Sequence, residues 1–123
     1  MRILLVEDEP KVASFIARGL KSESYTVDTA SDGLDAEHLA ITEPYDLVVL
    51  DIVLPGKDGL EVARTLKDNP ETSRIPVVAL TAHAMPGDES RAREAGCVGY
   101  IPKPIDVSRF ARQIAGYLRG GVS

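Results

Sequence analysis

Three stretches of four residues are apolar without interruption, and they restrict the fold more than any other feature: Ile3–Val6, Leu47–Leu50 and Val77–Leu80. A strand that reads this way has both faces buried, which is typical of the central strands of a parallel sheet covered by helices. Two weaker segments complete the set. Tyr25–Thr29 alternates between its two faces, which suits an edge strand, and Gly99–Ile101 is a shorter candidate.

Helical periodicity fills the gaps between these strands. Apolar residues recur at spacings of three and four, so each helix should turn one stripe toward the core. The segment Pro86–Ala95 is more polar and only weakly amphipathic, but its place in the alternation favours a helix there too. The stripes comprise Val12, Phe15, Ile16, Gly19 and Leu20; Leu34, Leu39 and Ala40; Leu60, Ala63 and Leu66; and Val107, Phe110, Ile114, Tyr117 and Leu118.

Alternating strands and helices predict an α/β fold of the (βα)5 type. We expect a doubly wound, parallel five-stranded sheet in the flavodoxin-like order 2-1-3-4-5, with a site at the carboxyl ends of the strands. Local signals agree with this alternation. Ser31 or Asp32, and Asp106, are suitable N-caps for the helices that follow them, and Gly96 suits a helix C-terminus.

Length and charge set the broad class. The 123 residues suffice for one compact domain, which we expect over residues 1–119, with a flexible tail at 120–123. The formal net charge of −5 disfavours direct binding to nucleic acid. A single cysteine, Cys97, precludes an internal disulfide, and no apolar run approaches the ~20 residues that cross a bilayer. We therefore expect a cytoplasmic protein without membrane contact.

Polar residues gather where the predicted strands end. The first strand runs into Glu7 and Asp8, the third into Asp51 and the fourth into Thr81, while Lys103 follows the fifth. If these ends meet at one edge of the sheet, three carboxylates lie together and repel one another unless a cation joins them. Ligands that are all oxygen favour Mg²⁺ over Zn²⁺, and a carboxylate can also act as a nucleophile toward phosphorus.

Four segments in this order resemble the receiver domain of bacterial two-component response regulators over essentially the whole chain. One such segment alone would be a weak signal, whereas the set at these strand ends is specific. The matching segments are Leu4–Glu9, Leu50–Gly56 with Gly59, Leu80–Ala82 and Tyr100–Pro104.

The resemblance implies a metal-dependent phosphoacceptor. By this likeness Asp51 would accept the phosphoryl group. Asp8, Asp51 and the backbone carbonyl of Val53 would ligate Mg²⁺, with Glu7 acting through water. Because Val53 is apolar and cannot position a hydrolytic water, we expect slow self-dephosphorylation.

The resemblance also implies a set of groups that hold the phosphoryl oxygens and report on them. Lys103, the Thr81 hydroxyl and the backbone N–H of Ala82 would bind these oxygens, and Lys103–Pro104 would be a cis peptide bond. Tyr100 would be the aromatic residue that follows Thr81 inward, although it also suits an ordinary core position. Glu7, likewise, has an alternative as a plain solvated acid.

A receiver domain of this kind would be a signalling switch of a phosphorelay rather than an enzyme, apart from self-phosphorylation and slow self-dephosphorylation. The phosphodonor would be a sensor histidine kinase or a histidine phosphotransferase. The output would be a protein contact through Pro86–Ala95, Gly99–Ile101 and the last helix. We expect a monomer or a weak dimer, since Val98 and Gly99 replace the acids that stabilise the dimers of receivers attached to winged-helix transcription factors.

The two halves of the chain resemble different receivers. The part through Asp32 is similar to receivers of winged-helix transcription factors, whereas Lys67–Ile105 is similar to free-standing receivers of the chemotaxis and cell-cycle type. This mixture leaves a chimaeric origin open.

Three other functions use the same fold or the same nucleophile. A flavodoxin-like FMN protein needs a phosphate-binding loop after the first strand, where Glu7 and Asp8 would repel phosphate. An aspartyl phosphatase or phosphotransferase usually carries a second Asp two residues after the nucleophile, where this chain has Val53. A pseudo-receiver would lack the acceptor set, which here includes Asp51 and Lys103.

Overall fold

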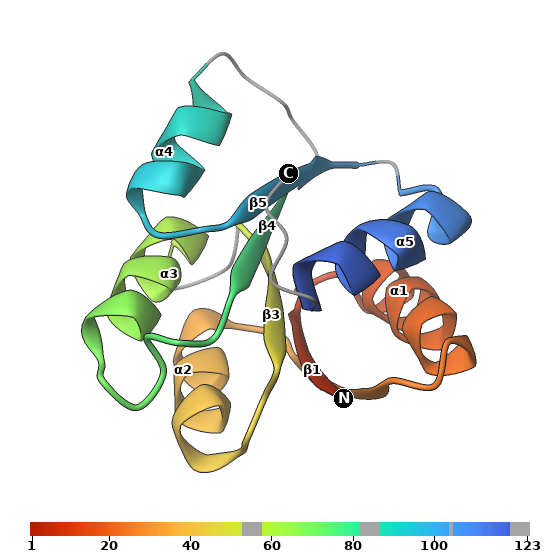
Figure 1. Ribbon diagram of the computed structural model, residues 1–123, viewed down its shortest axis with the longest axis horizontal. Coiled ribbons are helices and arrows are strands. Elements are labelled where there is room, and N and C mark those ends of the chain that lie inside the picture. Colours follow the sequence, from red (N-terminus) through yellow and green to blue (C-terminus); the bar gives the residue numbers. More distant parts are fainter. Residues whose placement is uncertain (53–57, 82–86, 104, 119–123) are drawn as a thin grey trace.

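The computed structural model describes residues 1–52, 58–81, 87–103 and 105–118. Five strands form one parallel sheet in the order β2-β1-β3-β4-β5, so the predicted (βα)5 topology is confirmed (Figure 1). No helix in these ranges is both long and apolar enough to cross a membrane. The elements are β1 (Arg2–Val6), α1 (Pro10–Ser22), β2 (Thr26–Ala30), α2 (Gly33–Thr42), β3 (Leu47–Asp51), α3 (Gly59–Asp68), β4 (Val77–Thr81), α4 (Asp88–Glu94), β5 (Gly99–Pro102) and α5 (Val107–Leu118).

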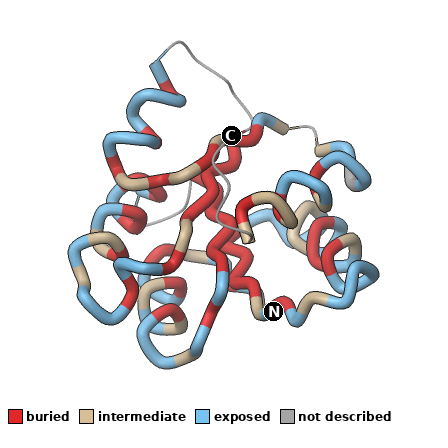
Figure 2. Tube along the Cα trace, viewed as in Figure 1, coloured by how far each residue is buried: buried red, intermediate tan, exposed pale blue. Residues whose placement is uncertain are grey.

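The three apolar tetrapeptides form the centre of the sheet. Every residue of β3 and β4 is buried, and so is every residue of β1 after Arg2 (Figure 2). The edge strand β2 is mixed, because Val27 and Ala30 are buried while Thr26 and Thr29 are exposed. Burial therefore follows strand order, as the sequence pattern predicts for a sheet covered on both faces.

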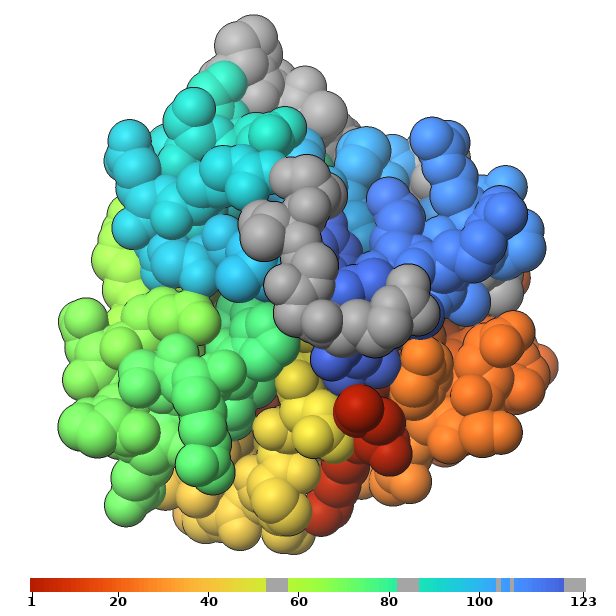
Figure 3. All heavy atoms as spheres, in the orientation of Figure 1, coloured from red at the N-terminus to blue at the C-terminus, as the bar shows by residue number. Residues whose placement is uncertain are grey.

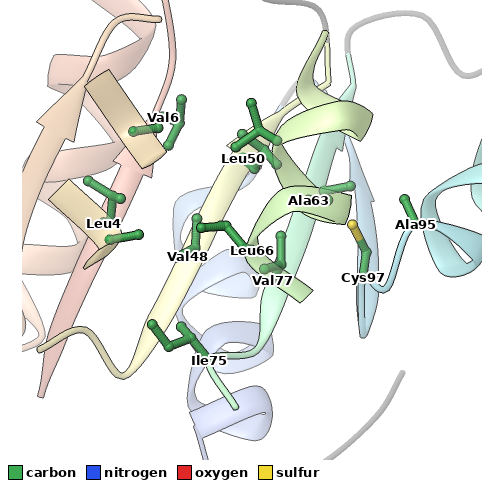
Figure 4. Close-up of a cluster of buried hydrophobic side chains, with 14 of the residues drawn as sticks. Leu4, Val6, Val48, Leu50, Ala63, Leu66, Ile75, Val77, Ala95 and Cys97 are labelled. Carbon is green, nitrogen blue, oxygen red and sulfur yellow. The ribbon is translucent and has the colours of Figure 1, made fainter. Parts of the chain in front are cut away.

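Successive residues of the central strands point to opposite faces and so build two cores. Leu4, Val48 and Leu50 belong to the core shared with α2, α3 and α4, whereas Leu5 and Val49 belong to the core shared with α1 and α5. Figure 4 shows part of the first core, in which Leu66 of α3 lies near Val48 and Val77. Both cores lie below the carboxyl edge of the sheet, and they form the apolar support for the polar residues there.

Among the residues of the predicted helical stripes whose burial the structure describes, two are exposed. Phe15 of α1 is 47% exposed, because α1 packs through Ile16, Ala17 and Leu20. Leu34 of α2 is 70% exposed. Leu34 is exposed because α2 turns its small residues toward the sheet. Gly33, Ala36 and Ala40 are buried at i, i+3 and i+7, and Leu34 lies beside this stripe and points outward.

The predicted helix signals are confirmed where the structure describes them. The carboxylate of Asp32 accepts a hydrogen bond from the Asp35 N–H, at 2.8 Å, and Asp106 accepts one from the Ser108 N–H. Gly96 follows α4 with a φ of +102°, a left-handed conformation that favours glycine. These signals therefore mark helix ends, as expected from the sequence.

A second glycine allows close packing between β5 and α5. A Cβ atom at Gly99 would collide with the hydroxyl and ring of Tyr117 on α5. Tyr117 is buried, and within the described residues its hydroxyl has no hydrogen-bond partner. Tyr117 therefore occupies the space that a residue larger than glycine at position 99 would need.

An ion-pair network closes the amino edge of the sheet, opposite the predicted site. Arg2 contacts the Asp28 carboxylate at 2.7 Å and Glu43 at 3.6 Å, and its guanidinium lies over the Tyr45 ring. The Tyr45 hydroxyl donates a hydrogen bond to Asp28 at 2.8 Å, and the Arg2 N–H donates one to Asp46. The network ties β1, β2 and the start of β3 together, and the sequence did not predict it.

Candidate phosphoacceptor site

The site is assembled by strand pairing. Asp51 ends β3 and pairs with Leu80, and Thr81 ends β4 and pairs with Pro102. The Lys103 N–H then donates to the Thr81 carbonyl at 2.7 Å, which extends the pairing of β4 with β5 by one residue. Residues far apart in sequence are thereby brought to one edge, as the fold prediction requires.

Lys103 joins two of the three acids. Its Nζ atom lies 2.6 Å from Oε2 of Glu7 and 3.1 Å from Oδ2 of Asp51. The side chains of Glu7 and Asp51 are 1% and 7% exposed, and that of Lys103 is 15% exposed. A buried ion pair of this kind is costly to leave without a partner, so each charge here depends on the others.

Burial and charge act in opposite directions in this cluster. Burial raises the pKa of Glu7, the hydrogen bond from Lys103 opposes that rise, and the neighbouring Asp51 adds to it. For Lys103, burial alone would lower the pKa, but hydrogen bonds to Glu7 and Asp51 outweigh burial and raise it. The ammonium is therefore held in its charged form between two carboxylates.

The acids also form a set that fits a divalent cation. Glu7, Asp8 and Asp51 each offer a carboxylate oxygen, and these atoms lie within 4.8 Å of one another. Asp8 is exposed, so the set opens to solvent, beside a groove whose lining includes Glu7, Asp8 and Arg18. Among the described residues, three carboxylates and one ammonium meet here and leave an excess of negative charge. Hard oxygen ligands are those that Mg²⁺ prefers.

Thr81 and Tyr100 are directly linked. Their hydroxyls are hydrogen-bond partners, with Thr81 buried at the end of β4 and Tyr100 half-buried on β5. Burial is the main reason that the pKa of Tyr100 is raised, and the nearby Asp88 carboxylate adds to it. Asp88 is buried at the start of α4 and is hydrogen-bonded to Arg91. The Asp88–Arg91 contact was not predicted, since nothing in the local sequence marks Asp88 as buried.

The other predicted site residues divide into two groups. Glu7 is more central than the sequence suggested, because it is buried and bonded to Lys103 rather than solvated. Val53, Ala82 and the Lys103–Pro104 bond fall outside the described residues, and so do residues 120–123. The predictions made for them therefore stay predictions.

A glycine holds the next helix against the acceptor strand. The Gly59 N–H donates to the Ile52 carbonyl at 3.3 Å, and a Cβ atom at Gly59 would collide with the backbone of Asp51 and Ile52. Asp58 begins the same helix by accepting a hydrogen bond from the Leu60 N–H at 2.9 Å. The start of α3 is thus fixed directly beside the backbone of Asp51.

Comparison with known proteins agrees with this geometry. The family model described as the response regulator receiver domain matches residues 3–115, and the chain belongs to this family. Among curated relatives, the polar-differentiation response regulators DivK of Brucella anthropi and Brucella ovis are each 42% identical over 116 residues. The match covers 94% of this chain and 94% of each relative.

Solved structures show the same fold. The receiver domain of the sensor histidine kinase PA1611 from Pseudomonas aeruginosa, solved with a magnesium ion coordinated in its active site cleft, is 33% identical with a TM-score of 0.88. That match covers 98% of both chains. A response regulator from Chloroflexus aurantiacus is 26% identical with a TM-score of 0.92, over 96% of this chain and 97% of that one.

Family membership confirms the receiver prediction and its flavodoxin-like topology. The chain is a regulatory phosphoacceptor domain of two-component signalling, rather than a flavin-binding redox protein on the same fold. The similarity to DivK extends through both halves of the chain. The chain belongs to the receiver family whether or not its two halves resemble different kinds of receiver.

Proposed function

We propose that the chain is a phosphorylation-dependent switch of a phosphorelay, with Asp51 as the acceptor of a phosphoryl group. The donor is a phosphohistidine of a sensor histidine kinase or a histidine phosphotransferase. The signal leaves through the face formed by α4, β5 and α5 as a change in protein contacts. The observation that carries this proposal is the contact of Lys103 with both Asp51 and Glu7 at the carboxyl edge of the sheet.

The chemistry follows from the surroundings of Asp51. A carboxylate oxygen of Asp51 attacks the phosphorus, a P–O bond forms, and the P–N bond to the donor imidazole breaks, leaving the imidazole to take up a proton. Lys103 lies on the same side as Oδ2, where its ammonium can stabilise charge on a phosphoryl oxygen. The phosphoryl oxygen would then compete with the Glu7 carboxylate for the Lys103 ammonium.

Mg²⁺ fits the acidic set, and when bound it neutralises negative charge on the phosphoryl oxygens. Asp8, Asp51 and the backbone carbonyl of Val53 would hold the ion, with Glu7 acting through water. Support comes from the closeness of the three carboxylates and from the magnesium in the related receiver domain of PA1611. Asp8, the exposed member, is the one most accessible to an entering ion.

The switch uses a hydroxyl with two competing partners. The Thr81 hydroxyl now contacts Tyr100, and binding a phosphoryl oxygen would draw Thr81 toward Asp51 and away from Tyr100. The backbone N–H of Ala82 would bind another oxygen. Tyr100 would then lose its polar partner and move, which changes the surface around β5 and α4. A phosphoryl group adds about −1.5 to −2 charges, enough to bias such an exchange.

The direct test is incubation with acetyl phosphate and Mg²⁺, followed by measurement of the intact mass. The wild type should gain the mass of one phosphoryl group, while Asp51→Asn should gain none, because it lacks the nucleophilic carboxylate. Chelation of the metal should prevent labelling of the wild type. Equal labelling of Asp51→Asn would refute the assignment of the acceptor.

The lifetime of the phosphorylated form depends on the apolar residue two positions after the acceptor. Val53→Asn should accelerate loss of the phosphoryl group, because a polar side chain at this position can orient a reacting water. The decay is followed by the same mass measurement after removal of acetyl phosphate. Val53→Leu serves as the matched apolar control, and an unchanged rate in the Asn variant would contradict the explanation.

A further inference from the structure

Helix α2 exposes large aliphatic side chains on its outer face. Leu34 is 70% exposed and Ile41 is 46% exposed, and they lie seven residues apart on one side of the helix with exposed His38 between them. The exposed large apolar residues of the described chain are Met1, Phe15, Leu34 and Ile41, so α2 contributes two of the four.

The inner face of α2 does not need these residues. Ala36 and Ala40 are buried against the sheet, and half-buried Leu39 packs on the same core. The helix therefore carries apolar residues on both faces, a pattern typical of a helix covered on both sides. Exposed apolar residues that lie together on one helix face, unlike scattered ones, are typical of a binding surface.

The exposed stripe leads into a groove. Ile41 also lines a groove of 770 Å³ between the end of α2 and the connection from α3 to β4. Pro44 and Pro70 contribute apolar surface there, and Glu71 and Arg74 belong to the same lining. In Figure 3 the residues after α2 (yellow) and those after α3 (green) lie side by side at the lower left. We call Leu34, His38, Ile41 and this groove the α2 surface.

Acidic residues predominate around the α2 surface. Residues 31–46 contain five acidic residues and no lysine or arginine. Asp35, Asp46 and Glu71 are exposed, while Glu43 lies 3.6 Å from Arg2. Arg74 is the base in the groove lining. An apolar stripe with an acidic border is complementary to an apolar stripe with a basic border.

We propose that the α2 surface is a docking site for an amphipathic helix of another protein, with large apolar side chains flanked by lysine or arginine. The apolar side chains would cover Leu34 and Ile41, and a basic side chain would reach the groove. A second copy of this chain is disfavoured, because two α2 surfaces would place acids against acids. An anionic membrane is disfavoured for the same reason.

This docking site is separate from the phosphoacceptor site. Leu34 and Ile41 do not belong to the cluster of Glu7, Asp8 and Asp51, and they lie outside the α4, β5 and α5 face. A helix bound to α2 would leave that face free. The chain could therefore be held by one partner through α2 while it signals to another.

The test uses two synthetic amphipathic peptides with identical leucine stripes, one flanked by lysine and one by glutamate. Titration into the full chain, followed by backbone amide NMR, should show binding of the lysine peptide with shifts on α2 and around the groove. The double variant Leu34→Ser/Ile41→Ser should weaken this binding by about tenfold, or about 1.4 kcal/mol. Phe15→Ser, which removes an exposed apolar residue from α1, should leave it unchanged.

Three outcomes would overturn the proposal: equal affinity of the wild type and the double variant, equal affinity for the glutamate peptide, or shifts centred on α1. Concentration-dependent dimerisation that the double variant abolishes would also overturn it, by identifying a second copy as the occupant. Unfolding in urea shows whether the double variant is folded. The double variant should be labelled by acetyl phosphate to the same extent as the wild type. Failure of the docking proposal is therefore distinguishable from failure of the proposed function.

Discussion

The two edges of the sheet each hold a cation among carboxylates, but the two groups of charges differ in how deeply they are buried. At the amino edge, Arg2 pairs with Asp28 while the Tyr45 hydroxyl donates to the same carboxylate. At the carboxyl edge, Lys103 faces Glu7 and Asp51, with Asp8 nearby. The amino edge is about a third exposed at Arg2 and Asp28, whereas the carboxyl edge is mostly buried.

This difference distinguishes a structural network from the proposed phosphoacceptor site. At the amino edge, hydrogen bonds satisfy the charge that is present, so the pKa of Asp28 is lowered, first by Tyr45 and then by Arg2. At the carboxyl edge, burial raises the pKa of Glu7 despite the bond from Lys103. Excess negative charge in a buried place costs stability unless a cation neutralises it, which suits the proposed metal-dependent site.

Removing the cation tests the comparison most severely. Lys103→Met should lower the free energy of unfolding by about 3 kcal/mol in the absence of metal, because it leaves the Glu7 carboxylate buried without its partner. Arg2→Met should cost much less, since the amino edge is more exposed and Tyr45 still donates to Asp28. Urea unfolding in the presence of a chelator measures both changes. Equal losses at the two edges would contradict the distinction between them.

Replacing a carboxylate by an amide should change stability in opposite directions at the two edges. Asp51→Asn removes one of three crowded negative charges and should raise the free energy of unfolding without metal by about 1 kcal/mol, the size of a modest charge repulsion. Asp28→Asn removes the partner of Arg2 and should lower it by about 1 kcal/mol. The comparison fails if both variants move in the same direction under the same conditions.

The smallest expected effect is the response of the amino edge to acid. The folded-state pKa of Asp28 is lowered from its ordinary value of 3.8, so its contribution to stability is present above that value and is lost as the pH falls through the lowered pKa. The difference in stability between wild type and Asp28→Asn should therefore shrink on acidification. Urea unfolding of both proteins across this range measures it, and a constant difference would show that the ion pair contributes nothing.

The strands, and the gathering of polar residues at one edge of the sheet, were predictable because their signals are local. Continuous apolar runs mark Leu47–Leu50 and Val77–Leu80 as central strands, and a parallel arrangement then brings the residues after them to one edge. Asp51 and Lys103 needed no further information, since the topology alone places them together. The predicted caps at Asp32 and Asp106 are local in the same sense.

The features that the sequence missed depend on distant partners. The sequence placed Glu7 among the site acids, but not its direct ion pair with Lys103, which lies 96 residues away and supplies its counter-charge. The network of Arg2, Asp28 and Tyr45 likewise joins three segments. The periodicity of α2 suggests Leu34 as a core residue, but small residues on the adjacent stripe allow closer packing and turn the leucine outward.

The contact between Gly99 and Tyr117 restricts how this family member can diverge. Because the tyrosine takes the space that a side chain on β5 would need, the two positions should vary together. Homologues with alanine or a larger residue at the position of Gly99 should carry something smaller than tyrosine at the position of Tyr117. An alignment of close homologues would then show these two columns as a covarying pair, separated by 18 residues in the chain.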